Sequence, residues 1–186
     1  MRLFWEKGYA QTSMDDVVHR TGVQRYGIYS TFGAKERLFQ RALDLYRDEV
    51  AVRWMEPLER STASLPEIRT FFEQFQGAIH RRQSRLGCLM VMTSMESSPL
   101  HAQTRKRVAE HFRRLQAAFA VSLGRARSRG RLRSGVDTEE TAAFLLGATI
   151  GLMAYLRSPA PRDAVAGYLR CLTGMIDTLE LHEEKK

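Results

Sequence analysis

Helical periodicity runs through this chain from end to end, and it constrains the fold more than any other feature. Apolar residues recur at intervals of three and four between turn-forming glycine, proline and serine residues, whereas the alternating β-branched runs of strands are missing. The turn residues mark about nine helical segments, at residues 1–7, 14–20, 24–31, 35–56, 66–83, 87–97, 100–128, 137–157 and 161–182. The sequence therefore predicts an all-α protein.

The order of segment lengths predicts two domains. Short segments come first and longer ones follow, and Pro57 disturbs the helix that joins them. We expect a small module at residues 1–46 and a larger helical domain at residues 47–186. The chain has 186 residues, of which 44% are hydrophobic, enough to bury a sizeable core.

Several classes of protein are excluded by what the sequence lacks. Two distant cysteines, Cys88 and Cys171, rule out a disulfide scaffold and a four-cysteine zinc site. The apolar stretch at residues 142–156 is shorter than the roughly 20 residues of a membrane span. Nucleophile elbows, phosphate loops and metal-ligand clusters are not found. We expect a cytoplasmic protein that is not an enzyme, binds no metal or cofactor and does not enter a membrane.

Residues 12–35 have the pattern of two short helices joined by a tight turn. Ser13 and Asp16 resemble a capping box at the start of the first helix. Gly22 suits a left-handed turn, and Val23 is expected to fill the core behind it. The second helix directs hydrogen-bonding groups outward, as a helix in a DNA major groove requires. Any glycine-turn pair of helices would share this pattern, so spacing alone leaves DNA binding open.

A longer set of residues makes the interpretation specific. It comprises Leu3-Phe4, Lys7-Gly8-Tyr9, Thr12-Ser13-Met14, Thr21-Gly22-Val23, Ile28-Tyr29, Phe32, Lys35-Glu36 and Leu38-Phe39. This set resembles the N-terminal signature of the TetR family of bacterial transcriptional regulators. The resemblance implies a three-helix DNA-binding module with a helix-turn-helix, a fourth helix that links it to the body, and a helical C-terminal domain that dimerises and binds a small effector.

The resemblance also implies roles for individual residues. Thr12 and Ser13 correspond to phosphate contacts, Gln24, Arg25 and Tyr26 to the base-reading start of the recognition helix, Tyr29 and Lys35 to phosphate clamps, and Thr31 to a position that can reach a base. Family members usually have a longer first helix, in which Met1 would fall near the middle. We therefore expect the first helix of the 1–46 module to be truncated.

The larger domain offers a weaker signal for a ligand pocket. A Gly-Cys-Leu segment at residues 87–89 resembles one branch of the family. Apolar and aromatic side chains that could line an adaptable pocket, together with one acid, are Phe72, Phe75, Met92, Met95, Glu96, Phe112, Phe119 and Met153. The same apolar residues would equally suit an ordinary core. Glu96 could recognise a cationic ligand or lie on the surface.

Two long C-terminal segments could form a dimer interface. Ala143, Gly147 and Gly151 make a stripe of small residues, and an apolar face on the last segment contributes Leu169, Leu172 and Ile176. Packing within one subunit would also satisfy these faces. The family resemblance favours a homodimer.

The charge distribution suggests a rival interpretation. The net charge is +8, and residues 51–136 carry 16 basic against 6 acidic side chains. A general nucleic-acid-binding protein could use the arginines at residues 105–107 and 125–133. The favoured prediction is a ligand-responsive regulator, a repressor that a small-molecule effector releases from double-stranded operator DNA.

Overall fold

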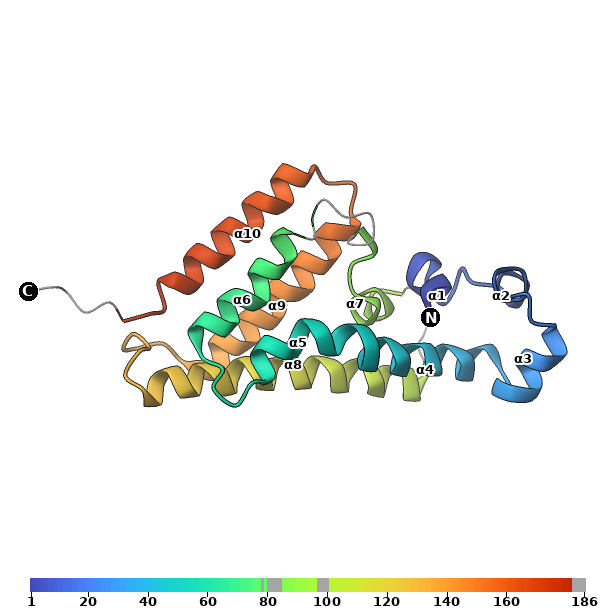
Figure 1. The fold of residues 1–186 in the computed structure, drawn as a ribbon, viewed down its shortest axis with the longest axis horizontal. Coiled ribbons are helices and arrows are strands. Elements are labelled where there is room, and N and C mark those ends of the chain that lie inside the picture. The colour runs from blue at the N-terminus through green and yellow to red at the C-terminus, as the bar shows by residue number, and fades with distance from the viewer. Residues whose placement is uncertain (78, 80–84, 97–100, 182–186) are drawn as a thin grey trace, which may run out of the picture. The chain divides into compact units, whose positions relative to one another are not determined.

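The computed structural model describes residues 1–77, 79, 85–96 and 101–181, and these residues form helices joined by short connections (Figure 1). The helices are α1 (Arg2–Lys7), α2 (Met14–Thr21), α3 (Arg25–Phe32), α4 (Lys35–Tyr46), the π-helical turn η1 (Arg47–Ala51), α5 (Val52–Glu59), α6 (Leu65–Gln76), α7 (Leu89–Ser94), α8 (Ala102–Ser128), α9 (Thr138–Arg157) and α10 (Arg162–Asp177). Among the described residues, β pairing is limited to one isolated bridge between Leu132 and Glu180. The all-α prediction is confirmed.

The helical path that begins at Lys35 is longer than predicted. It continues through α4, η1 and α5 to Glu59, and Pro57 lies buried inside α5 instead of ending it. Proline removes one backbone hydrogen bond from a helix, and α5 ends two residues later. The predicted disturbance is thus small. The domain boundary predicted at residue 46 stays a prediction.

Residues Met1–Val52 and Leu86–His111 form one compact unit. Its first three helices enclose a small core of buried side chains from Leu3, Met14, Val17 and Ile28. Val23 does not join this core as expected. Its side chain is 47% exposed and lies beside Gly27, because the turn at Gly22 directs it along the outside of α3.

Aromatic rings connect α1 to the rest of the first unit. The ring of Phe4 packs on Phe39 with 5.0 Å between centroids, and the Trp5 ring packs on Tyr46 at 4.9 Å. The short helix α7 packs against both α1 and α4. Helix α1 is thereby held on two sides by elements that come much later in the sequence.

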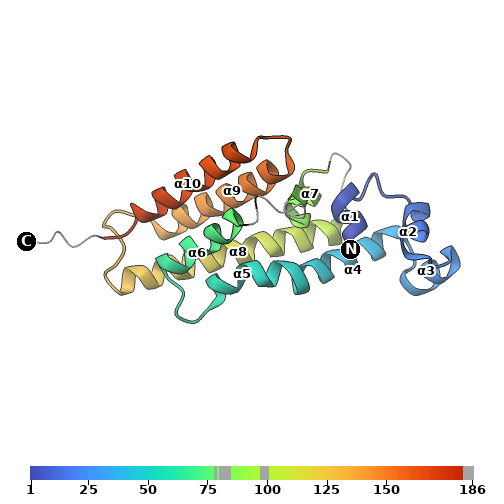
Figure 2. The same ribbon diagram turned by 45° about the horizontal axis from the view of Figure 1, so that its top comes forward.

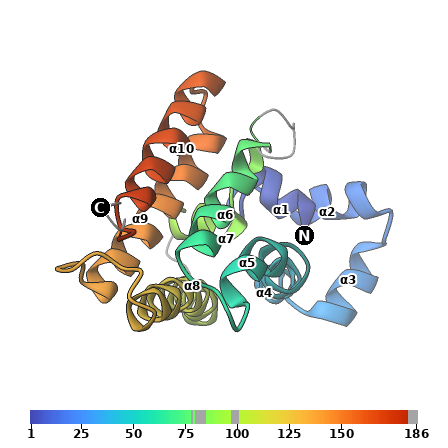
Figure 3. The same ribbon diagram turned by 60° about the vertical axis from the view of Figure 1, so that its left-hand side comes forward.

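Residues Arg53–Arg85 and Phe112–Lys186 form the second unit. Helices α6, α9 and α10 run side by side in it (Figures 2 and 3). Its core contains edge-to-face and stacked rings of Phe71, Phe72, Phe75 and Phe119. In the described part of the chain, no helix is long and apolar enough to cross a bilayer.

The Phe119 ring should dominate the stability of the second unit. It is fully buried, 5.4 Å from the centroid of Phe71 and stacked 5.9 Å from Phe72. Phe119→Ala should lower the free energy of unfolding by about 3–5 kcal/mol, because the cavity adds to the lost apolar burial. Urea denaturation measures this change. Val121→Ala, at a site on α8 that is 49% exposed, is the control; equal effects of the two substitutions would contradict the assigned core.

Candidate nucleic-acid interface

The predicted capping box opens α2. The Ser13 hydroxyl accepts a hydrogen bond from the Asp16 backbone N–H at 3.0 Å, and the Asp16 carboxylate accepts one from the Ser13 N–H at 2.8 Å. Two backbone donors at the helix start are satisfied in this way. Ser13 is exposed at this end of the helix, so its location suits the predicted contact with a phosphate.

A lysine completes the same cluster. The Lys7 ammonium lies 2.6 Å from Asp16 Oδ1, and this hydrogen bond, followed by those from Ser13, lowers the pKa of the Asp16 carboxyl well below its usual range. A lowered folded-state pKa means that the contribution to stability is fully present above about pH 4 and is lost as pH falls through the lowered value. The cap is therefore intact at neutral pH.

Helix α3 presents the polar surface that the sequence predicts. Ile28 is buried beneath it, whereas the side chains of Gln24, Arg25, Tyr26, Tyr29 and Thr31 are exposed. Tyr26 is 84% exposed, which is unusual for a large aromatic ring that serves only stability. The helix carries no acidic residue. These groups can donate and accept hydrogen bonds at base edges without repelling phosphates.

An acid on the neighbouring helix holds Arg25. The Arg25 guanidinium forms an ion pair with Asp15 of α2, and both side chains are mostly exposed. Such an exposed pair contributes little to stability. It holds the guanidinium at the start of α3. The sequence pattern does not identify Asp15, because an acid in the first turn of a helix is common for helix-dipole reasons alone.

Lys35, at the start of α4, lies over the ring of Tyr9, with 4.3 Å from Nζ to the ring centroid. Partial burial lowers the pKa of the Lys35 ammonium. The Tyr9 ring in turn lies 4.9 Å from Phe39. A lysine held on an aromatic face keeps its charge in a defined place, which suits a phosphate clamp.

Thr12 requires a correction. It is only 1% exposed, and its hydroxyl donates to the Gly8 carbonyl at 2.6 Å. The side chain therefore belongs to the interior of the loop between α1 and α2, because a buried hydroxyl needs an internal partner. We remove its side chain from the predicted phosphate contacts.

The predicted pocket residues fall in two different units. Met92, Met95 and Glu96 belong to the first, and the second contains Phe72, Phe75, Phe112, Phe119 and Met153. Met95 is 52% exposed rather than enclosed. The Glu96 carboxylate accepts hydrogen bonds from the backbone N–H groups of Tyr9 and Ala10, so it is not a free acid awaiting a cation. The effector pocket stays a prediction for the remaining residues.

The predicted dimer residues also divide into two groups. Leu169, Leu172 and Ile176 are buried inside the second unit, where α10 packs against α6 and α9. Assigning them to an interface is wrong, because the face that they occupy is already covered within the chain. Ala143, Gly147 and Gly151 are exposed on α9. Those three remain candidates for an interface.

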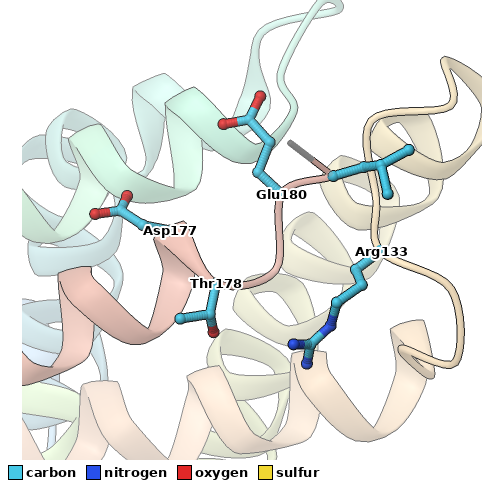
Figure 4. Close-up of a pocket in the computed structure, with 5 residues that line it drawn as sticks. Arg133, Asp177, Thr178 and Glu180 are labelled. Atoms are coloured by element: carbon cyan, nitrogen blue, oxygen red, sulfur yellow. The ribbon is translucent and has the colours of Figure 1, made fainter. Parts of the chain in front are cut away.

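A surface pocket of about 440 Å³ lies at the end of α10 (Figure 4). Its lining residues are Arg133, Asp177, Thr178, Glu180 and Leu181. Both carboxylates are already paired, Asp177 with Arg69 and Glu180 with Arg131. We assign no ligand to this pocket. Among the described residues, no group of three potential metal-ligating side chains lies together.

Several of the central arginines form hydrogen bonds or ion pairs with other groups of the same chain. Arg107 pairs with Asp44 at 2.9 Å. Arg125 and Arg129 donate to the backbone carbonyls of Arg60 and Thr62, at 3.1 and 3.2 Å. Arginines that satisfy acids and loop carbonyls are poorly placed to collect phosphates as well. This arrangement argues against the general nucleic-acid-binding alternative.

The fold and this surface define a helix-turn-helix DNA-binding regulator. Residues 1–42 match the family model for bacterial regulatory proteins of the tetR family, and residues 64–172 match the model for the tetracyclin repressor-like C-terminal domain. The chain belongs to the TetR family of transcriptional regulators, whose members are not enzymes.

Similar proteins agree with this assignment. The chain is 28% identical over 142 residues to the regulator YezE of Bacillus subtilis, covering 76% of this chain and 73% of that protein. It is 27% identical over 148 residues to the transcriptional repressor ComR of Escherichia coli, covering 78% and 70%. A TetR-family regulator from Agrobacterium tumefaciens has the same fold, with a TM-score of 0.82, 22% identity and coverage of 96% and 92%.

Arg25 and Lys35 should affect DNA binding in different ways. Arg25→Ala should cost about 1–3 kcal/mol of operator binding and relax the preference at one base pair per half-site. Lys35→Ala should weaken binding to DNA of every sequence by a similar factor. It should also lower the slope of log K against the logarithm of the salt concentration by about one. Fluorescence anisotropy on specific and random duplexes measures both. Equal losses of Arg25→Ala on the two duplexes would overturn its base-reading role.

Proposed function

We propose that this TetR-family regulator is a cytoplasmic repressor that binds operator DNA as a homodimer and leaves it when a small effector binds the C-terminal domain. The observation that carries the proposal is the exposed, acid-free face of α3, with Arg25 and Tyr26 at its start and Ile28 anchoring it. In a helix-turn-helix, the N-terminal residues of the second helix contact base edges in the major groove.

Phosphate contacts would flank the reading helix. Ser13 at the start of α2 and Tyr29 on α3 are exposed, and Lys35 at the start of α4 lies on the Tyr9 ring. The start of α2 adds the partial positive charge of a helix N-terminus. Contacts of this kind fix register on the duplex, while Gln24, Arg25, Tyr26 and Thr31 would supply the sequence preference.

A face of small residues supports the homodimer. Ala143, Gly147 and Gly151 are exposed on α9, next to the exposed ring of Phe144. An added Cβ at Gly147 would meet no heavy atom within 4 Å, so the surface above it is open to a partner helix. Two copies joined by a two-fold axis would place two recognition helices on half-sites about 34–36 Å apart.

Repression and effector release are supported by a relative and by the C-terminal domain. The relative ComR is named a repressor, and the match to the tetracyclin repressor-like C-terminal domain extends over residues 64–172. Binding of an effector to one of two conformations would shift their populations and thereby the DNA affinity. The predicted pocket would lie in the second unit, which contains Phe72, Phe75, Phe112, Phe119 and Met153.

The proposal is tested first by selecting DNA. The purified protein is incubated with random duplexes of about 30 base pairs, long enough for two half-sites, and the bound fraction is sequenced. We expect a two-fold symmetric motif. A promoter that contains this motif, fused to a reporter gene, should be less active when the protein is present. Enrichment of no motif would contradict the proposed function.

Gly147→Arg should produce monomers, because a long charged side chain would block close approach of a partner helix to α9. These monomers should bind a single half-site poorly. Light scattering measures the mass, and Gly124→Arg, at another exposed helical glycine with nothing within 4 Å of an added Cβ, is the matched control. An intact dimer for Gly147→Arg would move the interface elsewhere.

An effector should be recognisable by linkage. In a thermal-shift screen of apolar compounds, a true effector raises the melting temperature because it binds only the folded protein. The same compound should weaken the binding of operator DNA by roughly 5–150-fold. Operator DNA should weaken the binding of the compound by the same factor. A screen whose stabilising compounds all leave operator affinity unchanged would contradict effector release.

A further inference from the structure

The loop after α1 is bound by a carboxylate from a distant part of the sequence. Glu96, two residues after α7, accepts a hydrogen bond from the Tyr9 N–H at 2.6 Å through Oε1 and one from the Ala10 N–H at 3.2 Å through Oε2. All three residues belong to the first compact unit. Hydrogen bonds to an ionised acceptor are stronger than neutral ones.

Gly8 is shaped to admit this carboxylate. Its φ is +82°, in the region that side-chain-bearing residues rarely adopt, and a Cβ at this position would lie 2.5 Å from Glu96 Oε1. Only glycine combines that backbone conformation with the close approach. The positive φ of Gly8 and the missing side chain at this position thus leave room for the oxygen that accepts from Tyr9.

The loop that Glu96 holds carries the surface proposed to bind phosphates. Tyr9 supplies the ring beneath the Lys35 ammonium, 4.3 Å from its centroid, and Ser13 follows at the start of α2. Fixing the Tyr9 backbone thus fixes the platform on which Lys35 lies. Among the described residues, Glu96 makes no ion pair with Lys35 and acts on its ammonium only as a more distant charge, so the positioning effect passes through Tyr9.

A second pair of hydrogen bonds ties the other end of the same segment to α1. The Trp5 indole N–H lies 3.1 Å from both the Leu86 and the Gly87 carbonyl oxygens. Helix α7, between these two attachment points, packs against α1 and α4. Residues 86–96 therefore hold α1 at Trp5 and the loop after it at Tyr9.

We propose that Glu96 is a positioning residue for DNA binding: its carboxylate orders the backbone at Tyr9 and Ala10 and thereby holds Lys35 where it clamps a phosphate. This inference rests on the proposed function, in which Lys35 contacts DNA. It adds a residue outside the helix-turn-helix to the set that determines affinity.

The sign of the effect separates positioning from simple charge. Glu96 is an anion in a DNA-binding unit, so electrostatics alone predicts that its removal strengthens binding to a polyanion. Loss of positioning predicts the opposite. Glu96→Ala should weaken operator binding about tenfold, the scale of one charge-assisted hydrogen bond, and should lower the salt slope by about one.

The experiment compares variants on the operator duplex recovered by selection, by fluorescence anisotropy over a range of salt concentrations. Glu110→Ala is the charge-matched control, because Glu110 is exposed on α8 and lies 3.9 Å from Lys106. Glu96→Gln keeps one oxygen for the Tyr9 N–H and should recover most of the lost affinity. Lys35→Ala and the double variant Glu96→Ala/Lys35→Ala complete a double-mutant cycle.

Positioning predicts that the two losses do not add. Once Lys35 is absent, Glu96→Ala should weaken binding by less than about twofold, because the contact that it supports is already lost. Gly8→Ala, which disturbs the same contact from the loop side, should reproduce the salt slope of Glu96→Ala. Unchanged or tighter binding by Glu96→Ala, fully additive losses, or no recovery by Glu96→Gln would each overturn the inference.

The results also separate this inference from the proposed function. If Lys35→Ala leaves affinity and salt slope unchanged, the proposed phosphate clamp fails and the role of Glu96 fails with it. If Lys35→Ala weakens binding while Glu96→Ala behaves like Glu110→Ala, the clamp stands and only the positioning role is overturned. Circular dichroism melting identifies a variant that is unfolded. If Glu96→Ala is unfolded, Glu96→Met, which keeps the side-chain stem but has no oxygen to accept from the Tyr9 N–H, is measured in its place.

Discussion

The packing of α1 is the constraint on which the DNA-binding surface depends. Helices of six and eight residues are too short to be stable alone in water, so α1, α2 and α3 exist only while their apolar faces are buried. Leu3, Met14, Val17 and Ile28 form the core between the three helices, and Phe4 and Trp5 attach α1 to Phe39 and Tyr46 of α4. The recognition helix α3 is therefore oriented by the core beneath it, where Ile28 packs with Leu3, Met14 and Val17.

Charged side chains complete what aromatic packing begins. Lys7 and Asp16 fix the start of α2, Asp15 holds Arg25 at the start of α3, and Glu96 holds the loop between α1 and α2. The two ion pairs join helices that also share the small core, α1 with α2 and α2 with α3. Exposed pairs of this kind add little to stability. Their effect is to limit the orientations available to the groups that face DNA, which reduces the ordering cost of binding.

Local patterns predicted the parts of this molecule whose causes are local. Helical periodicity, the capping box at Ser13 and the left-handed turn at Gly22 depend on neighbouring residues, and the structure has all three. The exposed face of α3 followed from the same spacing. The predicted phosphate contact of Thr12 was wrong. A match to a family motif does not reveal that the Thr12 hydroxyl points inward and donates to the Gly8 carbonyl.

Features that depend on distant contacts could not be predicted from one sequence. Leu169, Leu172 and Ile176 form an apolar face whether it meets α6 or a second subunit, and only the fold shows that α6 covers it. The contact between Glu96 and Tyr9 joins residues 87 positions apart, and nothing near either residue signals it. Tertiary packing decides which side chains are buried and which distant residues contact each other. The periodicity of the sequence does not contain this information.

The central claim, that α3 reads bases in the major groove of a two-fold operator, is tested most directly by guanine methylation interference on the selected duplex. Methyl groups at N7 occupy the major groove, where the recognition helix would lie. The account predicts interference in two patches about one helical turn apart, related by the symmetry of the motif. Interference spread evenly along the duplex, or none at any guanine of the motif, would contradict it.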